Sequence, residues 1–252
     1  MNYKIEVRNL IKNFGTKKVL KGINLGFENR NSTVILGGSG SGKSVLIKNI
    51  IGLMSPDEGD IFVDGNNTTK ISTKERFKLM EKCGFLFQSG ALFDSLSVQE
   101  NIIFFAIKLR KMKKDERRDL AANKLKSVGL SPDIMNLYPS ELSGGMQKRV
   151  SLARAICTNP EIIFFDEPTT GLDPIMANVI NDLIIKVREE LGATTITITH
   201  DLESARQIGQ TYHLLYQGEI LWSGDKQNLD KSDNPYVEQF LAGKTTGPIQ
   251  IA

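Results

Sequence analysis

Apolar and polar residues alternate in the N-terminal part of the chain, and this alternation predicts extended strands. The apolar residues at every second position are Ile5, Val7, Ile23, Leu25 and Phe27. A period of two places them on one face of a pleated strand, so these segments are expected to form half-buried antiparallel strands. Residues 59–65 read Gly-Asp-Ile-Phe-Val-Asp-Gly and predict one more edge strand, bounded by turns.

Short continuous apolar runs predict a second kind of strand, buried on both faces. Residues 33–36 and 162–165 have this pattern, and the first runs directly into a glycine-rich loop. A further strand is expected over 194–199. A helix is expected after that loop, with an apolar face made of Val45, Leu46, Ile50 and Leu53. Helices are also expected over 174–190 and from Asp201 onward. Strands that alternate with helices indicate an α/β fold with a parallel sheet.

The middle of the chain predicts helices without intervening strands. Ser97 and Glu100 form a capping box before an apolar segment, and a second helix over 115–128 is expected to end at Gly129. Farther on, Asp173 is a good N-cap for the helix that begins with Pro174. The strandless region, approximately 89–160, is interpreted as an inserted helical subdomain.

Composition limits the possible functions. The 252 residues include 32 Lys and Arg against 29 Asp and Glu, and this net charge of +3 is too small for a nucleic-acid-binding domain. Two cysteines make neither a disulfide framework nor a metal-ligand pattern, which favours a reduced, cytosolic setting. The N-terminus lacks the apolar core of a signal peptide, and no run is long enough to span a membrane. Any membrane role is therefore expected to come through a partner.

One glycine-rich motif predicts phosphate binding. It consists of Gly37, Gly38, Ser39, Gly40, Ser41, Gly42, Lys43 and Ser44. Glycines allow the backbone to fold around phosphates with its N–H groups pointing inward, at the positive end of the next helix. Lys43 would reach the β- and γ-phosphates of a nucleotide, and the Ser44 hydroxyl would bind Mg²⁺. The alternative is a chance glycine-rich turn, which the position between a strand and a helix disfavours.

Two other motifs are ambiguous when each is taken alone. Asp166 and Glu167 end an apolar strand, where they could hold Mg²⁺ and polarise a water, or could simply be a solvated strand end. Leu-Ser-Gly-Gly-Met at 142–146 precedes a helix rich in cations and small residues. It could be a second phosphate-facing turn or an ordinary turn capped by Ser143.

The motifs in their order resemble the nucleotide-binding subunits of ABC (ATP-binding cassette) transporters, from about Tyr3 to Gly243. The matching segments are the Walker A motif at 37–44, the Q-loop glutamine Gln88, the signature at 142–146, the Walker B pair Asp166-Glu167, the D-loop at 171–173 and the switch histidine His200. Phe14 stands where the family places an aromatic side chain that stacks on adenine. Taken singly, Gln88, His200 and Phe14 would be interpreted as ordinary structural residues. Met146 and Gly171 depart from the usual family residues without removing a phosphate ligand.

The resemblance implies a P-loop NTPase (RecA-like) core with an antiparallel β subdomain and an inserted helical subdomain. It implies one ATPase domain over 1–243, followed by a C-terminal tail over 244–252. It also implies ATP and Mg²⁺ as cofactors, with Ser44, Gln88 and Asp166 around the metal. Glu167, His200 and Lys43 would act in catalysis. Residues expected to contact the nucleotide are Phe14, residues 37–44, Gln88, Ser143, Gly144, Gly145 and Asp173.

Longer segments resemble the ATPases of Mla-type lipid transporters. They include Phe-Gln-Ser-Gly-Ala-Leu-Phe at 87–93 and the segment 235–243. This implies a homodimer on the cytoplasmic face of a bacterial inner membrane, bound to an integral-membrane permease and to MCE-domain and STAS-domain subunits. The alternatives are an importer for another solute, a soluble ABC ATPase outside transport and a nucleotide-dependent module without hydrolysis. The basic stretch 108–126 could meet lipid headgroups or the permease, although a solvated helix face is the favoured interpretation.

Overall fold

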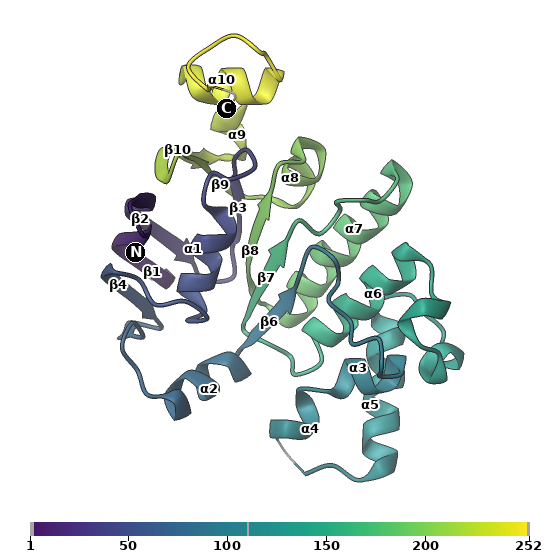
Figure 1. Ribbon diagram of the computed structural model, residues 1–252. Helices are drawn as coiled ribbons and strands as arrows, with labels where there is room; N and C mark the ends of the chain where they lie inside the picture. Colours follow the sequence, from purple (N-terminus) through teal and green to yellow (C-terminus); the bar gives the residue numbers. More distant parts are fainter. Residues whose placement is uncertain (1–2, 110, 251–252) are drawn as a thin grey trace. The chain divides into compact units, whose positions relative to one another are not determined.

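The computed structural model describes residues 3–109 and 111–250, and the chain divides into two compact units. One unit comprises Met1–Arg76 and Ile196–Ala252, and the other comprises Phe77–Thr195. Figure 1 labels most of the helices and strands of both. Within the described residues, no helix has the length and apolarity required to cross a bilayer.

The first unit contains an antiparallel sheet with the strand order β2-β1-β4-β5. Its strands are β1 (Tyr3–Phe14), β2 (Lys17–Glu28), β4 (Glu58–Val63) and β5 (Asn66–Asn67). The strands predicted from alternating residues are therefore confirmed. β4 is an edge strand over only part of its length, because β5 pairs with Phe62 and Val63. Gly59 is required where β4 approaches β1, since a side chain there would collide with the backbone of Arg8 and Asn9.

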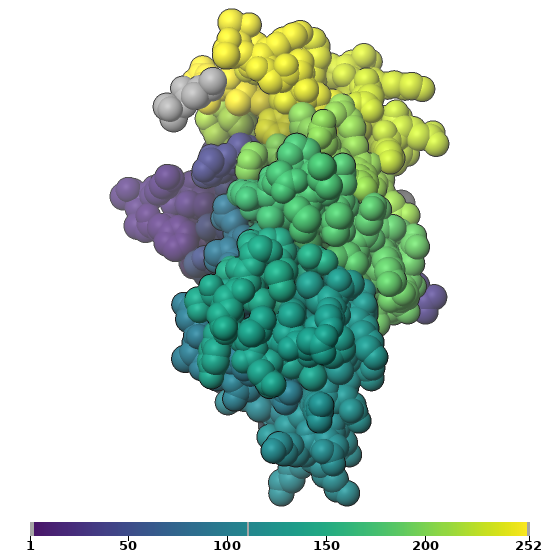
Figure 2. All heavy atoms as spheres, turned by 90° about the vertical axis from the view of Figure 1, so that its right-hand side faces the viewer, coloured from purple at the N-terminus to yellow at the C-terminus, as the bar shows by residue number. Residues whose placement is uncertain are grey.

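The first unit also contains a buried strand that leads into the glycine-rich loop. β3 (Ser32–Leu36) is buried at every position and pairs in parallel with β9, which pairs in antiparallel with β10. The remaining elements of this unit are α1 (Lys43–Ile50), α8 (Leu202–Ile208), β9 (Thr211–Tyr216), β10 (Glu219–Asp225), α9 (Lys226–Leu229) and α10 (Pro235–Ala242). Figure 2 shows the atoms of α10 and of residues 243–250, in yellow, gathered into one group.

The prediction that Leu53 belongs to the apolar face of α1 is wrong. Leu53 lies beyond the end of the helix and is 58% exposed. The chain turns at Gly52, whose φ is +75°, and the Arg76 guanidinium packs against that glycine. A residue in the left-handed conformation cannot continue a right-handed helix. The helix therefore ends before Leu53, although the apolar spacing in the sequence continues to that residue.

His213 on β9 is buried. Its Nδ1 lies 2.7 Å from the Ser223 hydroxyl oxygen, whereas its Nε2 is buried without a hydrogen-bond partner. The ring meets the Phe27 ring edge to face, with centroids 6.4 Å apart. Burial lowers the pKa of His213 to about 4.

We expect this histidine to make the fold acid-sensitive. An unfolded chain protonates the imidazole below about pH 6.5, whereas the folded chain keeps it neutral down to about pH 4. The free energy of unfolding therefore falls as the pH decreases through this window, by roughly 2 kcal/mol between pH 7 and pH 5. Denaturant unfolding at pH 7 and pH 5 should show this loss in wild type and less of it in His213→Asn. His200→Asn, which changes the exposed second histidine, should retain the wild-type loss; equal losses in both variants would contradict the assignment.

The second unit combines a parallel strand pair with a run of helices. β6 (Cys83–Leu86) pairs in parallel with β7 (Ile162–Asp166), and the rings of Phe85 and Phe164 stack 5.2 Å apart. The other elements of this unit are α3 (Val98–Ile103), α4 (Ala106–Leu109), α5 (Lys114–Ser127), the 3-10 helices η1 (Pro132–Asn136) and η2 (Pro139–Glu141), α6 (Gly144–Ala155) and α7 (Pro174–Leu191). Two elements, α2 (Thr73–Glu81) and β8 (Thr194–Thr199), cross from one unit to the other along the chain.

The helix signals of the middle region are confirmed in this unit. Ser97 and Glu100 form the expected capping box at the start of α3. Asp173 caps α7, and the left-handed Gly192 ends it. Most basic side chains of α5 lie at exposed positions, which agrees with a solvated face; residue 110 of the basic stretch lies outside the described residues. The α/β fold class is confirmed, while the boundaries 89–160, 1–243 and 244–252 stay predictions.

Candidate functional site

The glycine-rich loop lies between β3 and α1, and its backbone geometry requires glycine. Gly42, the N-cap of α1, has a φ of +110°, and a Cβ there would lie 3.1 Å from a Leu20 methyl. At Gly37 a Cβ would collide with the backbone oxygen of Leu215. No side chain caps α1, and its first turn contains no acidic residue. The positive end of α1 can therefore face an anion, as phosphate binding requires.

Lys43 places a cation on this loop. Its Nζ donates hydrogen bonds to Gly37 O at 2.6 Å and Gly38 O at 3.0 Å, and the residue is only 8% exposed. The hydroxyl of Ser41 is buried without a hydrogen-bond partner, and Ser44 is exposed in the first turn of α1. A buried hydroxyl without a partner and an ammonium group held on the same loop fit an anionic ligand such as the phosphates of a nucleotide.

The two carboxylates that follow β7 have different environments. Asp166, the last residue of β7, is partly exposed, whereas Glu167 is buried. Glu167 has a left-handed backbone, with a φ of +48°, and its Oε2 accepts a hydrogen bond from the Thr170 hydroxyl at 3.2 Å. A left-handed backbone is uncommon for a residue other than glycine and often occurs at functional sites. This environment favours a defined role for Glu167 over a merely solvated strand end.

The signature turn opens helix α6 with an accessible glycine. Ser143 is the N-cap of α6, and its hydroxyl accepts from the Met146 N–H at 3.3 Å. A Cβ on Gly144 would meet nothing within 4 Å, so this position is open. Gly145 instead packs against Met176 of α7, where a side chain would collide with the methionine methyl. Ser143 therefore caps α6, as an ordinary capped turn would require. The turn also has an open face at Gly144 that a phosphate could approach.

The other predicted residues are divided between the two units. Phe14 and His200 belong to the first unit with the loop at 37–44, and both are exposed. Gln88 and Asp173 belong to the second unit with Asp166 and Glu167. Asp173 Oδ1 accepts from two helix N–H groups of α7, each at 3.0 Å, so this carboxylate already has a capping role. The nucleotide contacts assigned to these residues stay predictions.

The structure adds Lys148 on α6, a buried residue that the motif analysis did not single out. Its Nζ donates to the backbone oxygens of Gln88 and Glu167, and thereby joins two of the predicted segments. Ser151 and Arg154 on the same helix donate to the backbone oxygen of Gly90. In the sequence, Lys148, Ser151 and Arg154 recur every three residues, which indicates that they share one side of α6. Only the folded structure shows which carbonyl groups these side chains contact.

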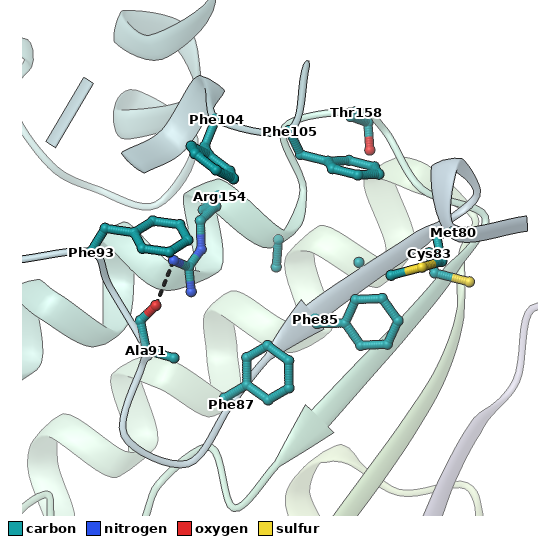
Figure 3. A pocket seen from close by; sticks show the side chains of 12 residues that line it. Met80, Cys83, Phe85, Phe87, Ala91, Phe93, Phe104, Phe105, Arg154 and Thr158 are labelled. Atoms are coloured by element: carbon teal, nitrogen blue, oxygen red, sulfur yellow. Dashed lines mark hydrogen bonds between the residues drawn. The ribbon is translucent and has the colours of Figure 1, made fainter. Parts of the chain in front are cut away.

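An aromatic pocket of about 330 Å³ lies beside the segment that follows β6. Phe85, Phe87, Phe93, Phe104 and Phe105 line it together with Arg154, as Figure 3 shows. The Arg154 guanidinium donates to Ala91 O at 2.7 Å and lies over the Phe93 ring. Phe87 and Phe93 remain about two-fifths exposed, at 39% and 43%. Exposed aromatic side chains around one pocket are typical of an interaction surface.

The donor set limits how a metal could bind. In the described part of the chain, no group of three or more His, Cys, Asp or Glu side chains could hold a metal ion. The predicted ligands offer a hydroxyl, an amide oxygen and a carboxylate, which are the oxygen donors that Mg²⁺ prefers. Such a small set fits Mg²⁺ that is held partly by nucleotide phosphates, since magnesium commonly uses one or two protein ligands with phosphates and water.

Comparisons with known proteins place the chain in one family. The sequence profile of the family described as ABC transporter matches residues 20–170. The "Probable ribonucleotide transport ATP-binding protein mkl" of Mycobacterium leprae is 39% identical over 100% of this chain and 72% of its own length. The "Intermembrane phospholipid transport system ATP-binding protein MlaF" of Haemophilus influenzae is 37% identical over 98% of this chain and 93% of its own length.

A solved structure of a dimeric ATP-binding cassette in a post-hydrolysis state, bound to ADP and Pi, is also similar. It is 34% identical, with a TM-score of 0.82 over 88% of this chain and 98% of that chain. The fold, the ordered motifs and these likenesses agree with one another. The chain belongs to the ABC transporter family and is an ATP-binding subunit that hydrolyses ATP.

Proposed function

We propose that this chain is the motor subunit of a membrane transporter that moves phospholipid between membranes. The observation that carries the motor role is the presence of two phosphate-facing turns in one chain. One is the loop at 37–44 with its held lysine, and the other is the turn with the open Gly144. A single nucleotide site needs only one such turn, whereas a site shared by two copies needs both.

Each nucleotide is then held between the loop of one copy and the signature turn of the other. Lys43 and the loop N–H groups neutralise phosphate charge, and the Gly144 turn approaches the nucleotide from the partner copy. Glu167 orients the attacking water, and His200 stabilises the γ-phosphate as it is transferred. The dimeric cassette bound to ADP and Pi, at 34% identity, supports this arrangement. Phe14, exposed at the end of β1, is available to stack on adenine.

The residues proposed to hold Mg²⁺ are Ser44, Gln88 and Asp166. Magnesium supplies positive charge to the phosphate oxygens when it is bound. The exposed Ser44 hydroxyl and the partly exposed Asp166 carboxylate leave their oxygens accessible to such an ion. Ser44 and Gln88 are also among the residues proposed to contact the nucleotide.

The lipid substrate is supported by the named relatives. The Haemophilus influenzae relative, named for intermembrane phospholipid transport, is matched over 93% of its length. A protein of Arabidopsis thaliana named TRIGALACTOSYLDIACYLGLYCEROL 3 is 37% identical over 98% of this chain. The mycobacterial relative is named for ribonucleotide transport, so a nucleotide importer is the second candidate. We favour phospholipid because the segments 87–93 and 235–243 also resemble the lipid-transport ATPases.

The proposed partners are a second copy of the chain, an integral-membrane permease, and accessory MCE-domain and STAS-domain subunits. The chain would lie on the cytoplasmic face of the inner membrane and reach the bilayer only through the permease. The aromatic pocket beside Gln88 supports a docking place for the permease, since Phe87 and Phe93 expose apolar surface there. Nucleotide state could then reach the membrane partner through the segment that carries Gln88.

Purification from native membranes tests this function. The tagged chain should co-purify with a permease and an MCE-domain protein, and the complex should release phosphate from ATP. Phe93→Asp, at the aromatic pocket, should recover much less permease than wild type because it places a charge on an apolar contact. Tyr138→Asp is the matched control, since Tyr138 is 47% exposed but does not line that pocket. Recovery of a nucleotide, sugar or amino-acid permease without an MCE protein would contradict the lipid assignment.

A further inference from the structure

One face of α6 holds the segment that carries Gln88. Lys148 Nζ donates to Gln88 O, the Ser151 hydroxyl donates to Gly90 O at 3.0 Å, and Arg154 donates to Gly90 O at 2.6 Å. These three side chains recur at intervals of three residues, which places them along one side of a helix. Of the three, Lys148 alone also reaches the turn that carries Glu167.

Lys148 is a buried cation between two proposed functional segments. The residue is 6% exposed, and its Nζ lies 3.5 Å from Glu167 O in addition to its contact with Gln88 O. Burial lowers the pKa of Lys148, while the nearby Asp166 and Glu167 carboxylates act in the opposite direction. Burying an ammonium group costs free energy unless its N–H groups donate hydrogen bonds. The hydrogen bonds of Lys148 to Gln88 O and Glu167 O therefore constrain both segments.

One of the two carbonyl groups that Lys148 contacts belongs to Glu167, whose backbone conformation is unfavourable. Glu167 is left-handed, with a φ of +48°, and its carbonyl oxygen also accepts from the Thr170 N–H at 3.3 Å. A left-handed residue other than glycine persists where surrounding contacts fix it. Two donors on this one oxygen constrain the peptide plane between Glu167 and Pro168, and thereby the backbone from which the Glu167 side chain extends.

We propose that Lys148 is a positioning residue for hydrolysis, which holds the Gln88 segment and the Glu167 turn in one arrangement. The proposal rests on the function proposed above for Glu167 and Gln88. Lys148 does not touch the nucleotide; it acts through the backbone of these two residues. Because it lies on the helix that begins at the signature turn, it also connects that turn to the residue that orients water.

The test is steady-state phosphate release by the full-length chain carrying Lys148→Met, Lys148→Arg or Ser151→Ala. We expect Lys148→Met to lower kcat roughly 10- to 100-fold while KM for ATP changes less than about threefold, because orientation is lost and binding is not. Lys148→Arg should recover most of the activity, since it keeps a charged donor. Ser151→Ala is the matched control: it removes a contact to Gly90 without touching Glu167, and its kcat should stay within about twofold of wild type.

A double-mutant cycle separates this role from a general loss of structure. If Lys148 acts through Glu167, Lys148→Met should not lower the residual turnover of Glu167→Gln any further. Equal losses in both backgrounds, an unchanged kcat in Lys148→Met, or an equal loss in Ser151→Ala would overturn the proposal. If Lys148→Met does not fold, Lys148→Gln, with a neutral donor, carries the same cycle. Failure of the wild-type chain to hydrolyse ATP would instead count against the proposed function.

Discussion

Glu167→Gln is expected to abolish nearly all ATP turnover while leaving ATP binding intact. The amide has the shape of the carboxylate and can still accept the hydrogen bond from the Thr170 hydroxyl, but it cannot act as a base toward water. We expect kcat to fall by roughly two orders of magnitude or more, the range for loss of a group that orients and activates water. Phosphate release and equilibrium binding of ATP measure the two properties separately.

The same variant should accumulate as a nucleotide-bound dimer. If two copies share each ATP, uncleaved nucleotide keeps them together, and light scattering during gel filtration should report twice the monomer mass with MgATP. Glu161→Gln is the matched control, because Glu161 is an exposed carboxylate immediately before the first residue of the same strand. It should turn over ATP as wild type does and should not accumulate as a dimer. Wild-type turnover in Glu167→Gln would refute the role assigned to this residue.

Lys43→Met should remove both tight nucleotide binding and hydrolysis. The ammonium group is the positive charge held on the glycine-rich loop, and its hydrogen bonds to Gly37 O and Gly38 O keep it there. Loss of a charge-assisted contact to phosphate is expected to weaken ATP affinity roughly 10- to 100-fold. Turnover should fall further, because the lysine also stabilises the charge of the transferring phosphoryl group. Calorimetric titration with ATP and phosphate release measure the two effects.

Lys48→Met provides the control for this change. Lys48 lies on the same helix, α1, and is exposed, so its loss removes the same charge without affecting the loop. Both variants should unfold at temperatures close to that of wild type. Wild-type ATP affinity in Lys43→Met would show that the loop N–H groups bind the phosphates without the lysine.

The elements of this fold were predictable where local chemistry specifies them. The alternation around Ile5 and Val7 and the capping box of Ser97 and Glu100 both have the predicted structure, because each depends on residues close in sequence. The exposed Leu53 shows the limit of this reasoning. The helical spacing of apolar residues continues past Gly52 to Leu53. The left-handed conformation of Gly52 and the packing of Arg76 against it end the helix before Leu53 is reached.

The candidate site divides in the same way. The sequence by itself determined the family and the motifs, because phosphate-binding loops need particular residue types at fixed spacing. Only the tertiary structure decided that Glu167 is left-handed and buried, that Asp173 caps α7, and that Lys148 joins Glu167 to Gln88. Such facts depend on which carbonyl groups a long side chain reaches in the folded chain. Sequence spacing does not encode that, because the partners come from distant segments brought together by packing.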